Sequence, residues 1–124
     1  MGRVVDFEIH CADLDRAERF YTEVFGWRID HWEGGPIDYR LITTGPDEQP
    51  GINGALTERR GGIGAEAVTA YVNTIQVEDL AETQRRIGVA GGEQVVEPAV
   101  IPGVGTVAYF KDTEGNVFGA LQPT

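Results

Sequence analysis

Hydrophobic and polar residues alternate along residues 4–11, near the start of the chain. The apolar positions share one face of an extended segment and the polar positions share the other: Val5, Phe7, Ile9 and Cys11 against Asp6, Glu8 and His10. Alternation with a period of two is typical of a β-strand that buries one side. The pattern therefore predicts a strand with ionisable side chains along its polar face.

A helix is expected directly after this strand. Asp13 is a suitable N-cap, apolar residues recur at helical spacing from Leu14 to Val24, and Gly26 supplies a C-terminal stop. Three further strands are expected between stretches rich in Gly and Pro, at residues 27–32, 39–44 and 52–57. The first part of the chain thus predicts the order β-α-β-β-β.

The second part of the chain predicts the same order again. A strand at 69–77 precedes Asp79-Leu-Ala-Glu82, which has the form of a capping box and begins a helix that ends near Gly91. The strands that follow are expected at 93–97, 106–111 and 117–122. A tight turn joins the last two, and Gly115 can adopt a positive φ there.

Weak internal similarity indicates a duplicated module, because Asn53-Gly-Ala-Leu56 resembles Phe118-Gly-Ala-Leu121. We interpret residues 1–124 as a single domain with βαβββ modules at 4–57 and 69–122 and a glycine-rich linker at 58–68. A single module covers one face of its sheet with its helix and leaves the other bare. Two modules can enclose their bare faces as a cleft, so the fold class expected is α+β with two paired modules.

Charge and composition limit the partners and the compartment. The chain carries 20 acidic and 10 basic side chains, a net charge of −10. This field repels phosphate backbones and anionic surfaces, so neither nucleic acid nor a membrane is expected as a partner. Since there is no long apolar run, no signal peptide pattern, and only the lone Cys11, we expect a cytoplasmic protein without an internal disulfide.

Five motifs carry a resemblance to a known family: Val5-Asp-Phe-Glu-Ile9, Arg19-Phe-Tyr21, Phe25-Gly-Trp27, Gly51-Ile-Asn-Gly54 and Lys111-Asp-Thr-Glu-Gly-Asn-Val-Phe-Gly119. Together with the element order, they resemble the vicinal oxygen chelate (glyoxalase/bleomycin resistance/dioxygenase) superfamily, most of all its bacterial branch related to lactoylglutathione lyase. The resemblance implies a homodimer and a cleft formed within one chain or between two. It does not settle function, because the superfamily includes isomerases, epimerases, dioxygenases, thiol transferases and drug-binding proteins without catalytic activity.

The resemblance also raises the question of a metal. In metal-dependent members the ligands are usually a His on the first strand and a Glu on the last strand of each module. These positions fall here on Asp6, Val72, Gly54 and Gly119. Because Val and Gly side chains cannot bind a metal, we expect no metal and no other cofactor. A weak site for a hard cation, formed by Asp6 and Glu8, remains an alternative.

The polar face of the first strand has two interpretations. It is either the solvated face of an antiparallel strand or, as the resemblance implies, part of the cleft lining. In a cleft, Glu8 is our first candidate for a general base and Asp6 the second, because apolar walls raise the pKa of a carboxyl group. Gly54 and Gly119 would either leave room for a ligand there or mark a close approach of backbones within the sheet. The other candidate ligand-binding residues are His10, Trp32, Tyr39, Leu56, Val72, Thr74, Tyr109 and Leu121.

The function favoured by the sequence is metal-free binding of a small molecule, either to sequester or to recognise an aromatic or amphipathic compound. The missing ligand positions and the aromatic content support it, although strand parity lets only one of Tyr109 and Phe110 face the cleft. The alternative is an isomerase, lyase or hydrolase that uses Glu8 or Asp6 as its base, with or without an unusual divalent metal site. A third possibility is an accessory domain that acts through a protein partner.

Overall fold

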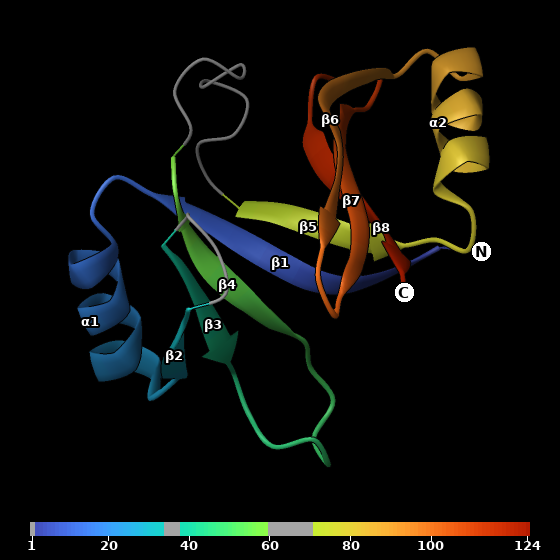
Figure 1. Cartoon of the computed structure of the whole chain (residues 1–124). Coiled ribbons are helices and arrows are strands. Elements are labelled where there is room, and N and C mark those ends of the chain that lie inside the picture. The colour runs from blue at the N-terminus through green and yellow to red at the C-terminus, as the bar shows by residue number, and fades with distance from the viewer. Residues whose placement is uncertain (1, 34–37, 60–70) are drawn as a thin grey trace.

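The computed structural model describes residues 2–33, 38–59 and 71–124. Its elements follow the chain in this order: β1 (Arg3–Cys11), α1 (Leu14–Phe25), β2 (Arg28–Trp32), β3 (Tyr39–Thr43), β4 (Asn53–Glu58), β5 (Tyr71–Gln76), α2 (Leu80–Val89), β6 (Glu93–Ile101), β7 (Gly105–Lys111) and β8 (Val117–Pro123). Figure 1 shows the order β-α-β-β-β twice along the chain. The expected α+β fold is confirmed. Most of the segment expected as the linker lies outside the described residues.

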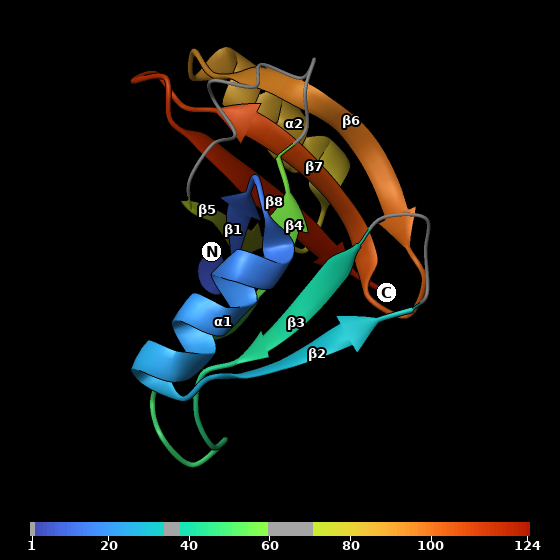
Figure 2. The ribbon, with the colours of Figure 1, turned by 90° about the vertical axis from the view of Figure 1, so that its left-hand side faces the viewer.

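All eight strands belong to one sheet, in the order β2-β3-β4-β1-β5-β8-β7-β6. β1 runs parallel to β4 and antiparallel to β5, so the first half (β1–β4) and the second half (β5–β8) join at a β1–β5 seam. In this structure the seam lies within one chain. In Figure 2 the outer strand pairs, β2–β3 and β6–β7, curve round from opposite sides of the seam.

The two helices cover one face of the sheet, called here the outer face, at opposite ends of the molecule (Figure 1). Asp13 caps α1 by accepting from Arg16 N at 3.0 Å, and Asp79 caps α2 in the same way. The core under α1 consists of Phe7, Ile9, Cys11, Leu14, Ile42 and Leu56. The core under α2 consists of Leu80, Ala108, Phe110 and Ala120. Neither described helix has the length and apolar character needed to cross a membrane.

The opposite face, called here the inner face, is also buried in the middle of the sheet. Glu8 and His10 are only 6% and 4% exposed, as buried as their apolar neighbour Ile9 at 6%. The interpretation of this side of β1 as a solvated face is therefore wrong. In the second half the inner face is apolar, because Val72 and Tyr109 pack there with Val95, Val96, Val107 and Val117.

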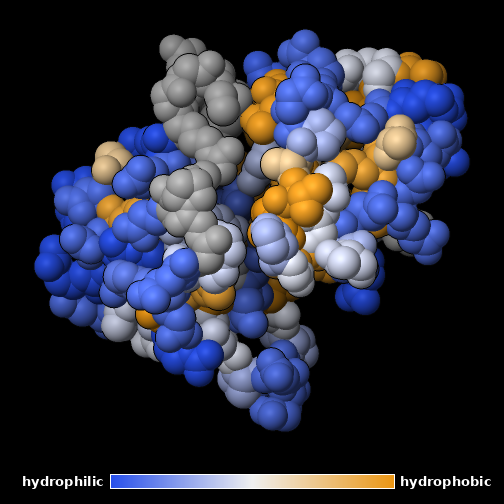
Figure 3. Space-filling view, viewed as in Figure 1, coloured by the Kyte–Doolittle hydropathy of each residue, from blue (hydrophilic) through white to orange (hydrophobic). Residues whose placement is uncertain are grey.

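The edge strand β6 is longer than its sequence predicts. The expectation ended the strand at Glu97, next to Pro98, but β6 continues to Ile101. Proline is tolerated on an edge strand because its missing N–H removes no interior ladder bond, and the pairing with β7 is irregular between Val96 and Ala99. Figure 3 shows hydrophobic side chains gathered over β6 and β7, while the rest of the view is mostly hydrophilic.

Candidate functional site

Glu8 is the centre of a hydrogen-bond network on the inner face. Tyr39 Oη donates to its Oε2 at 3.1 Å, and Tyr109 Oη donates to its Oε1 at 2.6 Å. His10 Nε2 lies 3.3 Å from the same Oε1. The carboxylate is therefore held by groups from β1, β3 and β7, which belong to both halves of the molecule.

The reach of Tyr109 shows that the sheet is strongly curved around Glu8. β7 is three strands away from β1 in the sheet order. Neighbouring strands lie about 4.8 Å apart, so a flat sheet would hold the two backbones about 14 Å apart. The tyrosine hydroxyl nevertheless lies 2.6 Å from the carboxylate. The inner faces of the two halves must therefore turn toward each other over β1.

These bonds fix the charge of Glu8. Burial alone would raise the pKa of its carboxyl group, but hydrogen bonds from His10 and Tyr109, the attraction of His10 and the bond from Tyr39 outweigh it. The pKa of Glu8 is therefore below its ordinary value, and the side chain is ionised at neutral pH. As an ionised carboxylate it only accepts hydrogen bonds, so its three partners direct their protons toward it.

Asp6 is the neighbouring carboxyl group on the inner face, and its electrostatics are the reverse. Burial and then the charge of Glu8 raise the pKa of Asp6 to about 7, against smaller opposing effects of hydrogen bonds from the Phe7 backbone and from Thr74. Thr74 lies directly opposite Asp6 on β5. Asp6 is half-buried, whereas Glu8 is fully buried. Of the two, Asp6 is the group that can exchange a proton near neutral pH.

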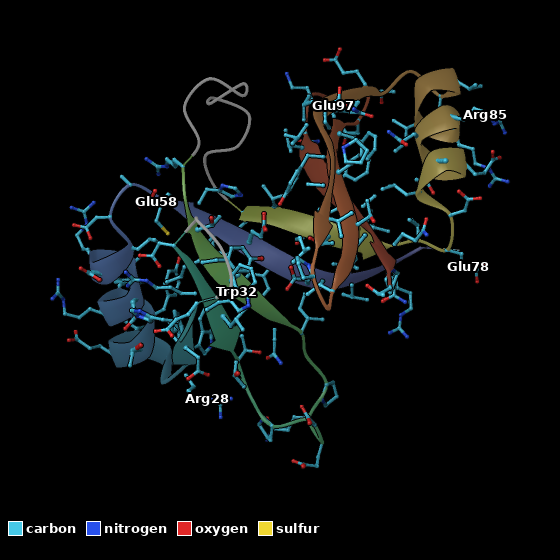
Figure 4. All side chains as sticks on the ribbon, in the orientation of Figure 1. Arg28, Trp32, Glu58, Glu78, Arg85 and Glu97 are labelled. Carbon is cyan, nitrogen blue, oxygen red and sulfur yellow. The ribbon has the colours of Figure 1, made fainter. Side chains whose placement is uncertain are left out.

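Most of the residues expected to line a cleft do face inward. The strand registers place Trp32 beside Tyr39, Val72 beside Glu8, and Thr74 beside Gly119. Tyr109 lies directly opposite Gly119, and Val107 lies opposite Leu121 on the same face. Phe110 belongs to the core under α2. Figure 4 shows Trp32 on the side of the first half that faces the second.

Gly54 and Leu56 are corrections to the expected site. Gly54 lies opposite Phe7, and Leu56 lies opposite Ile9, so both belong to the outer face and the core under α1. A Cβ at Gly54 would collide with the Phe7 carbonyl oxygen and lie 2.8 Å from its ring. This glycine makes room for a backbone rather than for a ligand. Ala55 is the residue of β4 that stands beside Glu8.

Gly119 does lie on the inner face, but close packing surrounds it. A Cβ there would lie 3.3 Å from Thr74 Oγ1 and 3.4 Å from the Tyr109 ring. These distances leave little free space around the glycine. Because Gly119 has no side chain, the Tyr109 ring can pack against β8 while its hydroxyl group reaches Glu8.

The residues around Glu8 do not fit the metal site of the metal-dependent relatives. The side chains opposite it are Ala55 and Val72, and neither has an atom that can bind a metal. Both oxygens of Glu8 already accept bonds from protein donors. Among the described residues, no three His, Cys, Asp or Glu side chains are grouped so as to hold a metal ion. Neither of the functions proposed below requires a metal.

Within the part of the chain that the structure describes, two buried polar atoms on the inner face have no hydrogen-bond partner: His10 Nδ1 and Thr57 Oγ1. Thr57 lies directly opposite both His10 on β1 and Tyr39 on β3. Thr57 is not among the residues that the sequence led us to expect in the cleft. Its position follows from the parallel register of β1 and β4, and nothing in the local pattern of β4 reveals that register.

A cavity of about 560 Å³ lies elsewhere, between α2 and the outer face of the second half. Its lining includes Ile75, Ile87 and Phe118 together with the acidic Asp79 and Glu82. In Figure 4, Arg85 on the same helix points away from the sheet. This cavity is separated from Glu8 by the sheet itself, so it takes no part in the network.

Comparisons with known proteins agree with this fold. The family described as “Bleomycin resistance protein-like N-terminal” matches residues 3–44. The “Probable lactoylglutathione lyase” of Vibrio parahaemolyticus is 31% identical over 98% of this chain and 91% of its own length. A “Glyoxylase-like domain-containing protein” of Didymella fabae is 30% identical over 93% of this chain and 89% of its own. The chain belongs to the vicinal oxygen chelate superfamily.

Solved structures of the superfamily share the fold at lower sequence identity. A glyoxalase/bleomycin resistance protein/dioxygenase superfamily member from Vibrio splendidus has a TM-score of 0.64 at 18% identity, with all of both chains covered. Methylmalonyl-CoA epimerase from Mycobacterium tuberculosis has a TM-score of 0.68 at 20% identity, covering 98% of this chain and 87% of its own. At this identity the likeness concerns the fold alone.

Proposed function

We propose that this member of the vicinal oxygen chelate superfamily binds a small molecule on its inner face, around Glu8, without a metal. The observation that carries the proposal is the network in which Tyr39, from the first half, and Tyr109, from the second, hold one buried carboxylate. A buried charge is costly unless it is fully hydrogen-bonded, and fixed polar groups of this kind give binding sites their specificity.

The two walls of the inner face indicate an amphipathic ligand. The first half supplies polar groups, namely Asp6, Glu8 and His10, and the aromatic pair Trp32 and Tyr39, whose ring centroids are 6.1 Å apart. The second half supplies the valine cluster around Tyr109. A ligand with an aromatic or apolar body and a polar group at one end complements both walls.

The test is a titration of isotope-labelled protein followed by two-dimensional NMR. Indole, 4-ethylphenol and 2-phenylethanol are suitable probes, because each joins an aromatic body to a polar group. Shifts concentrated at Asp6, Glu8 and Tyr109, unchanged when a chelator is added, support metal-free binding at this site. Thr106 lies on the same face of β7 as Ala108, which belongs to the core under α2. Glu8→Gln should weaken the binding, and the outer-face control Thr106→Val should not. Shifts confined to the cavity under α2, or no shifts at all, contradict the proposal.

A second candidate function is proton transfer with Asp6 as the base. The raised pKa of Asp6, about 7, favours it, and so do the enzyme names of several relatives. Glu8, our first choice from the sequence, is less suitable because its pKa is lowered and both its oxygens accept protein hydrogen bonds. Asp6 therefore replaces Glu8 as the preferred base in this proposal.

This activity can be tested with the compounds that the relatives' names suggest. Lactoylglutathione and methylmalonyl-CoA would each be incubated with the protein in deuterium oxide, and exchange followed by mass spectrometry. Exchange that rises with pH around 7 and is lost in Asp6→Asn, but survives in Thr106→Val, supports the proton transfer. Exchange that is the same in Asp6→Asn and wild type excludes Asp6 as the base.

The homodimer and the cytoplasmic location remain predictions of the sequence analysis. Light scattering tests the first of them directly, since the chain has a mass of 13.5 kDa. Twice this mass in solution supports the dimer. A mass near that of the single chain contradicts it.

A further inference from the structure

The unpartnered atoms of His10 and Thr57 form a second polar location on the inner face, next to Glu8. Both residues are almost fully buried, at 4% and 1% exposure. They lie directly opposite each other on the parallel strands β1 and β4, so their side chains leave the sheet on the same side. A buried polar group without a hydrogen bond destabilises a protein, and each such group in a native structure calls for an explanation.

The bond to Glu8 determines which hydrogen-bond role His10 has left. Glu8 is ionised and only accepts, so the nitrogen facing it, Nε2, must carry a proton. When the imidazole is neutral, the other nitrogen, Nδ1, then has a lone pair and accepts, whereas in the imidazolium it would donate; the subsite is proposed for the neutral form. Thr57 has a hydroxyl group, which can donate through its proton and accept through its oxygen. The location therefore offers one acceptor beside one group that can donate.

A single hydroxyl group satisfies both atoms, since its proton can go to His10 Nδ1 and its oxygen can accept from Thr57 Oγ1. A carboxylate is less suitable, because its oxygens would face the lone pair of His10. An ammonium group has no acceptor for the Thr57 proton and would lose its hydration in a nearly closed place. We propose that His10 and Thr57 form a subsite that binds an alcohol hydroxyl of the ligand. This inference rests on the proposed binding function and names the chemistry of the ligand's polar end.

The subsite lies beside the aromatic part of the inner face. Tyr39 is directly opposite Thr57 on β3, and Trp32 is directly opposite Tyr39 on β2. A hydroxyl held by His10 and Thr57 would therefore belong to a molecule whose body extends along these rings. An aromatic alcohol has both parts.

The experiment compares 2-phenylethanol with ethylbenzene, which lacks only the hydroxyl group. Affinities would be measured by NMR titration at pH 8 for wild type, Thr57→Val and the outer-face control Thr106→Val. The ring nitrogens of His10 would be followed in histidine-labelled protein. The chain has two histidines, and the exposed His31, bonded to Glu18, serves as the internal reference.

The expected result has three parts. In the free protein, His10 carries its proton on Nε2. In wild type and Thr106→Val, the alcohol binds about tenfold to hundredfold more tightly than ethylbenzene, because its hydroxyl makes two hydrogen bonds, and it shifts His10 Nδ1 but not His31. In Thr57→Val, this preference falls about fivefold to tenfold, because the bond from Thr57 is lost while the bond to His10 Nδ1 remains.

Other outcomes separate this inference from the proposed function. Equal binding of both compounds by the wild-type inner face overturns the hydroxyl subsite and leaves the binding function in place. A proton on Nδ1 of His10 in the free protein also overturns the subsite alone. If neither compound shifts any inner-face residue, both the subsite and the proposed binding site are wrong.

Discussion

The hydroxyl group of Tyr109 lies 2.6 Å from Oε1 of Glu8, although 101 residues separate the two in the chain. Glu8 lies on β1 at the seam, and Tyr109 lies on β7 in the second half. This bond therefore links the halves directly across the inner face, in addition to the backbone pairing of β1 with β5. Its effects on stability and on charge can be measured separately.

Replacing Tyr109 by Phe removes a donor from a buried carboxylate. Hydrogen bonds to charged groups contribute about 1.5–3 kcal/mol, so we expect Tyr109→Phe to lower the free energy of unfolding by that amount. Urea denaturation at pH 7.5 measures it. The matched control is Tyr21→Phe, which removes the exposed hydroxyl bond to Tyr71 and should cost under about 1 kcal/mol. Equal losses of unfolding free energy in the two variants would show that the bond to Glu8 stabilises the protein no more than an exposed hydrogen bond does.

The two carboxyl groups should give opposite pH dependences. The folded-state pKa of Asp6 is raised to about 7, so its contribution to stability is full below about 4 and is lost as the pH rises through 7. The pKa of Glu8 is lowered, so its contribution is present above its ordinary value and is lost as the pH falls through the folded-state pKa. Urea denaturation from pH 5 to 8 should show a decline in wild type that is absent in Asp6→Asn. If the free energy of unfolding declined equally in wild type and Asp6→Asn, titratable groups other than Asp6 would be responsible.

Thr57→Val should stabilise the free protein. The variant keeps the shape of the side chain and removes a buried hydroxyl that has no partner among the described residues. Replacing an unsatisfied polar group by an apolar one of the same shape is worth about 1 kcal/mol or more. Thermal unfolding would reveal a higher melting temperature, while Thr106→Val on the outer face should change stability by less than about 0.5 kcal/mol. A loss of stability in Thr57→Val would mean that the hydroxyl makes a bond in solution.

The glycines of β4 and β8 should respond differently to the same substitution. Gly54→Ala places a Cβ against the Phe7 backbone, which cannot move without disturbing the β1–β4 pairing. We expect a loss of about 3 kcal/mol, typical of severe overpacking. At Gly119 the nearest atoms lie at 3.3–3.4 Å and belong to side chains, so Gly119→Ala should cost about 1 kcal/mol or less. Chemical denaturation of both variants makes the comparison, and equal costs would contradict the assignment of the two faces.

Local patterns in the sequence predict the elements well, because caps and alternation are local. Asp13, Asp79 and Gly26 stand where the helices begin and end, and Gly115 has the expected positive φ of 82°. The pairing of strands is not local, and it decides which side chains meet. The family resemblance assigned Gly54 to the inner face, whereas the register of β1 with β4 places Ala55 there, and a difference of one residue changes the face.

Because strand pairing is not a local property, the sequence also does not reveal the surroundings of Glu8. Alternation along β1 correctly separates the two faces, but it carries no information on what covers the polar one. The curvature that brings Tyr109 over Glu8 comes from the whole sheet. The sequence favoured Glu8 over Asp6 as a base because it does not reveal the hydrogen bonds that lower the pKa of Glu8, which come from three separate strands.

The seam between β1 and β5 lies within one chain, and this frees the two halves from having to match. A symmetric dimer of single modules would repeat every inner-face residue, so a carboxylate on one wall would face a carboxylate on the other. Here the residue of β5 directly beside Glu8 is Val72. The first half therefore presents charged groups and the second half apolar ones, so a ligand bound between them has one favourable orientation.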